Sequence, residues 1–126
     1  MKDTFQIFQR DENQVVFPEG QVVFNEGDPG QQMYVVTAGE AEIRIGGRVL
    51  ETLGAGEIFG EMALVDPGQP RAATVAAKTE LKCAVIDERR FQFLVEQTPR
   101  FALQVMRVLV GRLRRMDEYV SRGQLA

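Results

Sequence analysis

Short apolar runs separated by turn residues fill the first two thirds of the chain. Residues 41–45 alternate apolar and polar side chains, which is typical of a strand with one buried face. Gly46 and Gly47 follow, and a pair of glycines between two such runs predicts a two-residue hairpin turn. The predicted strands are residues 15–17, 21–24, 33–37, 41–45, 48–50, 72–77 and 81–86. Short strands at this spacing indicate an all-β sandwich or barrel, and we expect a jelly roll.

The pattern becomes helical after Asp87. Asp87 is a favourable N-cap for a helix over residues 88–97, and Pro99 marks a second helix start. Apolar residues then recur at helical spacing, which predicts a long helix over residues 99–120, and a shorter helix is expected at residues 5–10. The expected fold class is therefore mainly β with flanking α. It is a jelly roll with a short N-terminal helix, a short hinge helix and a long C-terminal lid helix.

Length and composition limit the function classes. A chain of 126 residues is the size of one ordinary domain, so a single domain over residues 1–126 is expected. The N-terminal residues lack the apolar core of a secretory signal, and no apolar run reaches the roughly 20 residues of a membrane span, so we expect a cytoplasmic location. Cys83 is the only cysteine and lies in an apolar run, which indicates a small core residue.

The chain contains no histidine. This removes the commonest acid/base group near neutral pH, the commonest imidazole metal ligand and every Ser-His or Cys-His nucleophile. We therefore expect neither an enzyme nor a metal site, and no cofactor. The net charge of −3 argues against a surface built for nucleic acid, so the arginines that crowd the last quarter of the chain are expected to form a solvated helix face.

The candidate chemistry lies in two short stretches, FGEMAL at residues 59–64 and PRAATV at residues 70–75. A helix turn beginning at Gly60 would point several backbone N–H groups at one place, which is a favourable anion site. Arg71 would add a full charge and a forked donor. A buried Glu61 would be costly unless it accepted hydrogen bonds from hydroxyls of the same ligand. One phosphate, a neighbouring sugar hydroxyl and an apolar body meet these demands together, and they describe a cyclic nucleotide.

Residues 59–75 resemble the phosphate-binding cassette of the cyclic nucleotide-binding domain family. The family includes cAMP-dependent protein kinase regulatory subunits, cyclic nucleotide-gated channels and bacterial catabolite activator proteins. Residues 17–43 resemble its opening strands, and the helical tail resembles its hinge and lid helices. The resemblance implies that Glu61 holds the ribose 2′-hydroxyl and that Arg71 pairs with the phosphate. It also implies that Gly60 and the amides of Met62, Ala63 and Ala72 hold the phosphate, and that Ile43 and Ile45 line the sugar and base side. The expected ligand-binding residues are Phe59, Gly60, Glu61, Met62, Ala63, Leu64, Arg71, Ala72, Ala73, Ile43, Ile45 and Arg112.

The cassette also departs from the family pattern. Residues 66–69 make its connection one residue longer than in the kinase regulatory subunits, which is closer to the bacterial receptors. Ala72 stands where many bacterial receptors carry a hydroxyl residue, and where cGMP-selective members tend to have Thr or Ser. The expected ligand is therefore cAMP, with cGMP as the second candidate.

Arg112 is the one arginine of the last helix that projects into its apolar stripe. On a helical wheel counted from Phe101 it falls near ~20°, and the stripe comprises Val105, Val108, Leu109, Leu113 and Met116. In one interpretation the Arg112 stem covers the core and its head reaches water. In the other, its guanidinium stacks on the adenine when the last helix closes over the pocket.

Two functions from different classes remain open at this point. The first is a cAMP-binding switch whose last helix moves and acts on an unidentified effector protein. The second is a scaffold or dimerisation module that keeps the fold, uses the last helix for partner binding and has a vestigial pocket. Retention of Gly60, Glu61 and Arg71 favours the first. No direct nucleic acid binding and no membrane span are expected, a dimer through the last helix is compatible with both hypotheses, and the sequence is either a stand-alone sensor or part of a larger protein.

Overall fold

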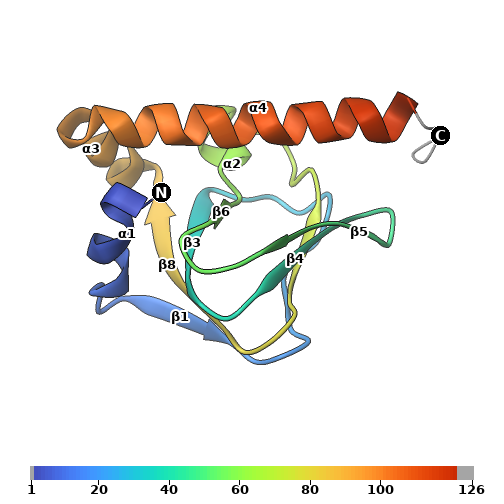
Figure 1. The fold of residues 1–126 in the computed structure, drawn as a ribbon, viewed down its shortest axis with the longest axis horizontal. Helices are drawn as coiled ribbons and strands as arrows, with labels where there is room; N and C mark the ends of the chain where they lie inside the picture. The colour runs from blue at the N-terminus through green and yellow to red at the C-terminus, as the bar shows by residue number, and fades with distance from the viewer. Residues whose placement is uncertain (1, 122–126) are drawn as a thin grey trace.

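The computed structural model describes residues 2–121, which form two four-stranded antiparallel sheets with four helices around them (Figure 1). The strand orders are β1-β8-β3-β6 and β2-β7-β4-β5. The strands are β1 (Gln14–Phe17), β2 (Val22–Phe24), β3 (Gln32–Ala38), β4 (Ala41–Ile45), β5 (Arg48–Leu53), β6 (Ile58–Phe59), β7 (Thr74–Ala77) and β8 (Leu81–Asp87). The helices are α1 (Lys2–Gln9), α2 (Met62–Val65), α3 (Glu88–Gln97) and α4 (Pro99–Ser121).

The expected jelly roll is confirmed, and every predicted strand has a counterpart. The β4–β5 hairpin turns at Gly46 and Gly47, which have φ values of 58° and 81°, the left-handed conformation that a tight hairpin turn requires. The strand β6 was not predicted, because it has only two residues. β7 begins at Thr74, later than expected, so Ala72 and Ala73 belong to the loop before it.

Two hydrophobic cores follow from the alternation of side chains along the central strands. On β3, Val36 faces the core between the sheets, whereas Met33 and Val35 face the core beneath the helices. On β8, Cys83 lies in the first core, where burial raises its pKa to about 12. Cys83 is thus a buried thiol, as the apolar run around it indicated.

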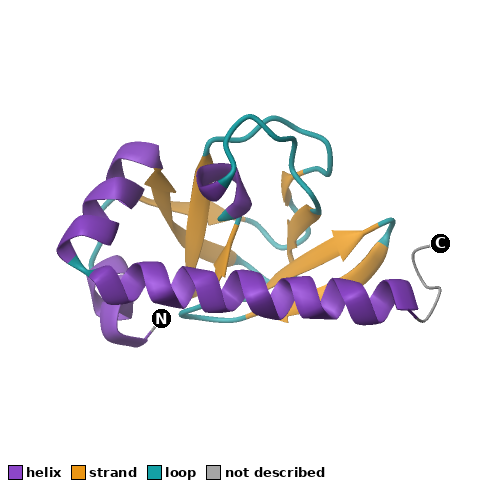
Figure 2. Cartoon of the chain, turned by 90° about the horizontal axis from the view of Figure 1, so that it is seen from above, coloured by secondary structure: helices purple, strands orange, loops and turns teal. Residues whose placement is uncertain are grey.

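The helices gather on one side of the roll (Figures 1 and 2). α3 begins where predicted, because the Asp87 carboxylate accepts a 2.8 Å hydrogen bond from the Arg90 amide. The Arg90 guanidinium also forms a 2.5 Å ion pair with Asp11, just after α1. α4 then runs along the whole length of the roll, from α3 to the β4–β5 hairpin (Figure 1).

The prediction that Leu113 lies on the inward face of α4 is wrong. Val105 is buried, and Val108, Leu109 and Met116 are half-buried, but Leu113 is 64% exposed. A single helix resting on the roll buries only a narrow arc, and Leu113 falls outside it. The exposed apolar residues of α4 form an outer seam: Leu103, Met106, Val110 and Leu113.

Within residues 2–121, no helix has both the length and the apolar character needed to cross a membrane.

Candidate functional site

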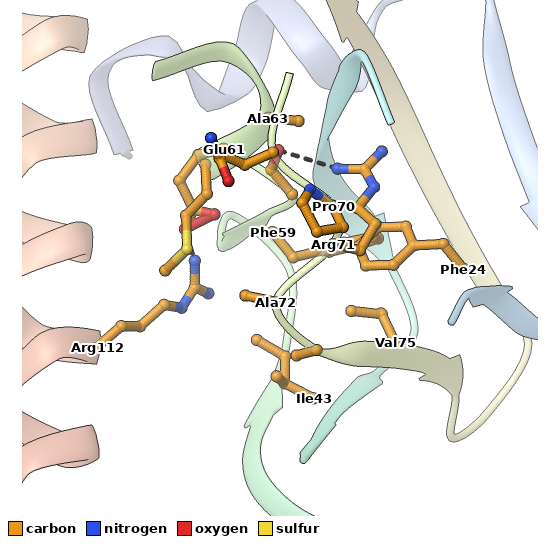
Figure 3. Close-up of a pocket in the computed structure, with 14 residues that line it drawn as sticks. Phe24, Ile43, Phe59, Glu61, Ala63, Pro70, Arg71, Ala72, Val75 and Arg112 are labelled. Atoms are coloured by element: carbon orange, nitrogen blue, oxygen red, sulfur yellow. Dashed lines mark hydrogen bonds and ion pairs between the residues drawn. The ribbon is translucent and has the colours of Figure 1, made fainter. Parts of the chain in front are cut away.

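A cavity of about 70 Å³ lies between α2, β4, the loop before β7 and the inner face of α4 (Figure 3). It is lined by Phe24, Ile43, Phe59, Gly60, Glu61, Met62, Ala63, Gln69, Pro70, Arg71, Ala72, Ala73, Val75 and Arg112. The walls are mostly apolar, with one carboxylate and two guanidinium groups among them.

Gly60 connects β6 to α2 in a conformation that other residues rarely adopt. Its φ is 78°, and a β-carbon there would lie 3.1 Å from the carbonyl oxygen of Gln32. The expected helix turn begins two residues later than Gly60, since α2 starts at Met62. Glu61 is the N-cap of α2 but makes no capping bond with its side chain, which leaves the carboxylate directed at the cavity. The chain therefore turns sharply at Gly60 and places a buried acid directly after the turn.

Arg71 is buried, and its contacts include no carboxylate within hydrogen-bond or ion-pair distance among the described residues. Its NH1 donates to the Gly60 carbonyl at 3.2 Å (Figure 3), and its Nε is buried without a hydrogen-bond partner. The ring of Phe24 lies 4.0 Å from Cζ, a cation–π contact. Burial lowers the pKa of Arg71, with Tyr34 and Asp28 acting in the opposite direction. A buried cation held in this way still needs an anion.

Aromatic rings form the floor beneath Arg71. Phe59 stacks on Tyr34 with ring centroids 4.9 Å apart, and Phe24 lies 6.0 Å from Phe59 and 6.2 Å from Tyr34. The loop between β2 and β3 also holds the Arg71 backbone, whose N–H donates to the carbonyl of Asp28 at 2.8 Å. Both the side chain and the main chain of Arg71 are thus fixed by β2, β3 and the loop between them.

Arg112 reaches from α4 toward the cavity and pairs with Glu61 (Figure 3). The side chains of Arg112 and Glu61 are 8% and 3% exposed, so this ion pair is largely withdrawn from water. Arg112 NH2 donates to the carbonyl of Ile58 at 2.5 Å, and Nε donates to Glu51 at 3.1 Å. Burial lowers the pKa of Arg112, and Glu51 opposes that shift.

These contacts decide one of the two interpretations of Arg112. The guanidinium points inward as the helical wheel predicts, but its head is buried, so the interpretation in which it reaches water is wrong. Stacking on a base stays a prediction. Nε and NH2 donate hydrogen bonds at the edge of the guanidinium, and such in-plane bonds do not use its two flat faces.

The cavity brings together all but two of the residues expected at the ligand. Leu64 packs beside the core beneath the helices, and Ile45, the last residue of β4, is not among the residues that line the cavity. Sequence reasoning missed Phe24, Gln69, Pro70 and Val75 as lining residues and Glu51 as a partner of Arg112. The sequence pattern could have identified Glu51 as inward-facing, because it lies two residues before the core residue Leu53 and therefore on the same face of the strand.

Comparison with known proteins agrees with this geometry. A family model described as the cyclic nucleotide-binding domain matches residues 14–98. The CRP-like cAMP-activated global transcriptional regulator of Mycobacterium tuberculosis is 34% identical over 114 residues, covering 85% of this chain and 50% of the regulator. The cAMP-dependent protein kinase regulatory subunit of Yarrowia lipolytica is 46% identical over 85 residues, covering 66% of this chain and 22% of the subunit.

Among solved structures, the catabolite activator protein of Thermus thermophilus superimposes with a TM-score of 0.78 at 28% identity, covering 98% of this chain and 58% of that one. The chain thus spans about half the length of the bacterial regulator and about a fifth of the kinase subunit. The expectation that this chain does not bind nucleic acid directly is not supported by its similarity to a transcriptional regulator.

Proposed function

Because this chain belongs to the cyclic nucleotide-binding domain family, we propose that it is a sensor module that binds cAMP and transmits binding through α4. The module acts by binding rather than by catalysis, without a cofactor, and in the cytoplasm.

The observation that carries the proposal is the isolation of Arg71. A buried guanidinium is normally paired with an acid, yet Arg71 donates to one carbonyl, rests on one aromatic ring and keeps Nε without an acceptor. Glu61, the acid among the residues that line the cavity, is paired with Arg112 instead. The site therefore offers a full positive charge on the cassette side, which suits the cyclic phosphate of a nucleotide.

Glu61 supplies the second half of the recognition. Arg112 pairs with Oε1 of Glu61, so the carboxylate keeps acceptor positions for a ribose 2′-hydroxyl. Ile43, Phe59 and Val75 provide an apolar surface between the two charged groups for the sugar and base. The proposed ligand contacts are the residues that line the cavity.

Ligand binding requires α4 to move. A cavity of about 70 Å³ is well below the roughly 300–1,000 Å³ of typical small-molecule pockets, and Arg112 closes it from the α4 side. A nucleotide would separate α4 from α2 and then rebuild contacts with Arg112. Binding thereby favours one position of α4 through differential contacts, and the changed position is the output.

Dimerisation is the second candidate function, and the outer seam favours it. Leu103, Met106, Val110 and Leu113 are all exposed and follow the alternating three- and four-residue spacing of a coiled-coil stripe. A second copy of the chain would cover this stripe, and nucleotide-dependent motion of α4 would then alter the dimer. Sedimentation velocity with and without cAMP tests this, and a monomer at all concentrations would contradict it.

Titration calorimetry with cAMP and with cGMP tests the proposed function. We expect binding of both with cAMP preferred. Arg71→Ala should weaken binding by about 2–5 kcal/mol, because the phosphate loses its full counter-charge in a buried site. Arg48→Ala, which removes an exposed arginine from the β4–β5 hairpin, is the matched control and should bind normally. If the protein bound neither cAMP nor cGMP, the sensor function would be contradicted. Full affinity in Arg71→Ala would contradict only the assignment of Arg71 to the phosphate.

A further inference from the structure

Glu51 is an acid on the inward face of an edge strand. It lies on β5 directly opposite Ile43 of β4, which lines the cavity. Cross-strand partners share one face of a sheet, so Glu51 faces the same side as the pocket residues. Its side chain is only 14% exposed. Burying a carboxylate on this face is costly unless cations compensate it.

Two arginines from α4 provide that compensation. Oε2 of Glu51 accepts from Arg112 Nε at 3.1 Å, and Oε1 pairs with Arg115 NH1 at 2.8 Å. Residues three apart on a helix lie on neighbouring parts of its surface, so one carboxylate engages two adjacent turns of α4. Glu51 therefore fastens the lid helix to the β4–β5 hairpin beside the cavity.

The same arginine is shared between Glu51 and the site. Arg112 uses Nε for Glu51 and NH1 for Glu61, and NH2 bonds to Ile58 O. Glu51 does not line the cavity, and its influence on a ligand must pass through Arg112. Glu51 holds the Arg112 guanidinium at Nε, and Glu61 holds it at NH1.

We propose that Glu51 is a positioning residue that acts as the latch of α4 and sets how often the nucleotide site opens. This inference deepens the proposed function and rests on it. A nucleotide enters and leaves when α4 has moved outward, because the cavity is too small for it with α4 in its present position. Since Glu51 contacts α4 rather than the ligand, its bonds resist opening before a nucleotide enters and again before it leaves.

A latch of this kind has a specific kinetic signature. Weakening it raises the open fraction in both the free and the bound protein, so association and dissociation accelerate by similar factors. The equilibrium affinity then changes little. A residue that merely helped to hold the ligand would instead raise the dissociation rate and lower the affinity.

Stopped-flow fluorescence with a cAMP analogue labelled at position 8 of the purine measures both rates and leaves the 2′-hydroxyl free for Glu61. For Glu51→Gln we expect both rates to rise by roughly ten- to hundredfold, the range of a lost charge-assisted bond, with the dissociation constant within about threefold of wild type. An unchanged association rate, alone or with faster dissociation, would overturn the latch. Glu40→Gln removes an exposed acid just before β4, away from Arg112, and should leave both rates unchanged.

Arg115→Gln provides a second arm that is safer for folding. The Arg115 side chain is 48% exposed and pairs only with Oε1 of Glu51. We therefore expect both rates to rise in Arg115→Gln, but by less than in Glu51→Gln. The exposed Arg114→Gln is its control. Without nucleotide, hydrogen exchange should be faster across β5 and α4 in Glu51→Gln than in wild type, and equal exchange would overturn the latch. This readout decides the latch even if wild-type protein binds neither cAMP nor cGMP, a result that would refute only the proposed function.

Discussion

The guanidinium of Arg71 occupies the space that a β-carbon on Gly30 would need. Such an atom would lie 2.1 Å from Nε and 2.3 Å from Cζ of Arg71. The ring of Phe24 lies 4.0 Å from the same Cζ. Gly30 and Phe24 therefore form the two walls of a slot that holds the proposed phosphate-binding group.

Gly30→Ala is expected to weaken cAMP binding by about 1–3 kcal/mol. The added methyl displaces the end of a flexible side chain rather than backbone, so the protein should fold while Arg71 leaves its slot and loses its charge-assisted contact with the phosphate. Calorimetry and a thermal melt measure the two effects. Gly54→Ala is the matched control, because nothing lies within 4 Å of the added β-carbon there. Unchanged affinity in Gly30→Ala would show that the slot is not needed for binding.

Local signals made most of the fold predictable. The Asp87 N-cap, the Gly46–Gly47 turn and the alternation of β4 act within a few residues, and each gave the correct element. β6 escaped prediction because its two residues pair with β3, which is distant in sequence. The exposure of Leu113 escaped it because a helical wheel gives direction but not the width of the buried arc.

The candidate site was predictable where its residues are close in sequence and not where they meet across the fold. The cassette around Glu61 and Arg71 came from its motif, and the inward direction of Arg112 from periodicity. The ion pairs of Arg112 with Glu61 and Glu51 join residues 51 and 61 positions apart, and no local pattern contains such contacts. The position of Glu51 on the inward face of β5 could be predicted from the sequence, but its arginine partners are identified only by the packing of α4.

Asp11→Asn is expected to destabilise the protein by about 1 kcal/mol at pH 7, as for a partly exposed ion pair. Burial would raise the pKa of Asp11, but its bonds to Asn13 and Arg90 outweigh this and hold the pKa below its ordinary value of 3.8. A carboxylate with a lowered folded-state pKa contributes stability above its unfolded pKa and loses it as the pH falls through the folded pKa. Urea unfolding should therefore show a gap between wild type and variant that is full at pH 7 and shrinks below roughly pH 3.8.

Glu12→Gln changes the neighbouring, exposed acid and is the control for Asp11→Asn. It should leave the unfolding free energy within about 0.5 kcal/mol of wild type. A gap between wild type and Asp11→Asn that stays constant down to pH 3 would mean that the ion pair with Arg90 is not its source.

Ala72→Thr is expected to shift nucleotide preference toward cGMP by about 1 kcal/mol. Ala72 lines the cavity and is exposed, so a threonine hydroxyl has room there to form a hydrogen bond with the guanine amino group. The net contribution of one hydrogen bond is about 1 kcal/mol. Competition calorimetry gives the ratio of the two dissociation constants. Ala55→Thr, at an exposed position outside the cavity, should leave the ratio unchanged. An unchanged ratio in Ala72→Thr would exclude position 72 as the discriminator.

Arg112 pairs with Glu61, and Arg112→Lys tests whether it also stacks on the base of the nucleotide. Removing the side chain entirely would leave two largely buried acids, Glu61 and Glu51, without this partner, and breaking such pairs costs about 3–5 kcal/mol of stability. Lysine keeps the positive charge but lacks the flat guanidinium face that stacks on a purine. We therefore expect the variant to fold and to bind cAMP more weakly by about 0.5–2 kcal/mol, the cation–π range.

A ligand without a base separates the two roles of Arg112. Ribose 3′,5′-cyclic phosphate keeps the phosphate for Arg71 and the 2′-hydroxyl for Glu61, but it offers no ring for Arg112. If stacking is the role of Arg112, Arg112→Lys weakens cAMP binding and leaves binding of the baseless ligand nearly unchanged. Equal losses for both ligands would assign Arg112 to the support of Glu61 alone. Hydrogen exchange adds the mechanical test, because α4 should become more protected when cAMP binds wild type, and a smaller gain is expected in the variant. Equal protection of α4 with and without cAMP in wild type would rule out the lid, since a helix that closes over the ligand through Arg112 must lose exchange-competent openings on binding.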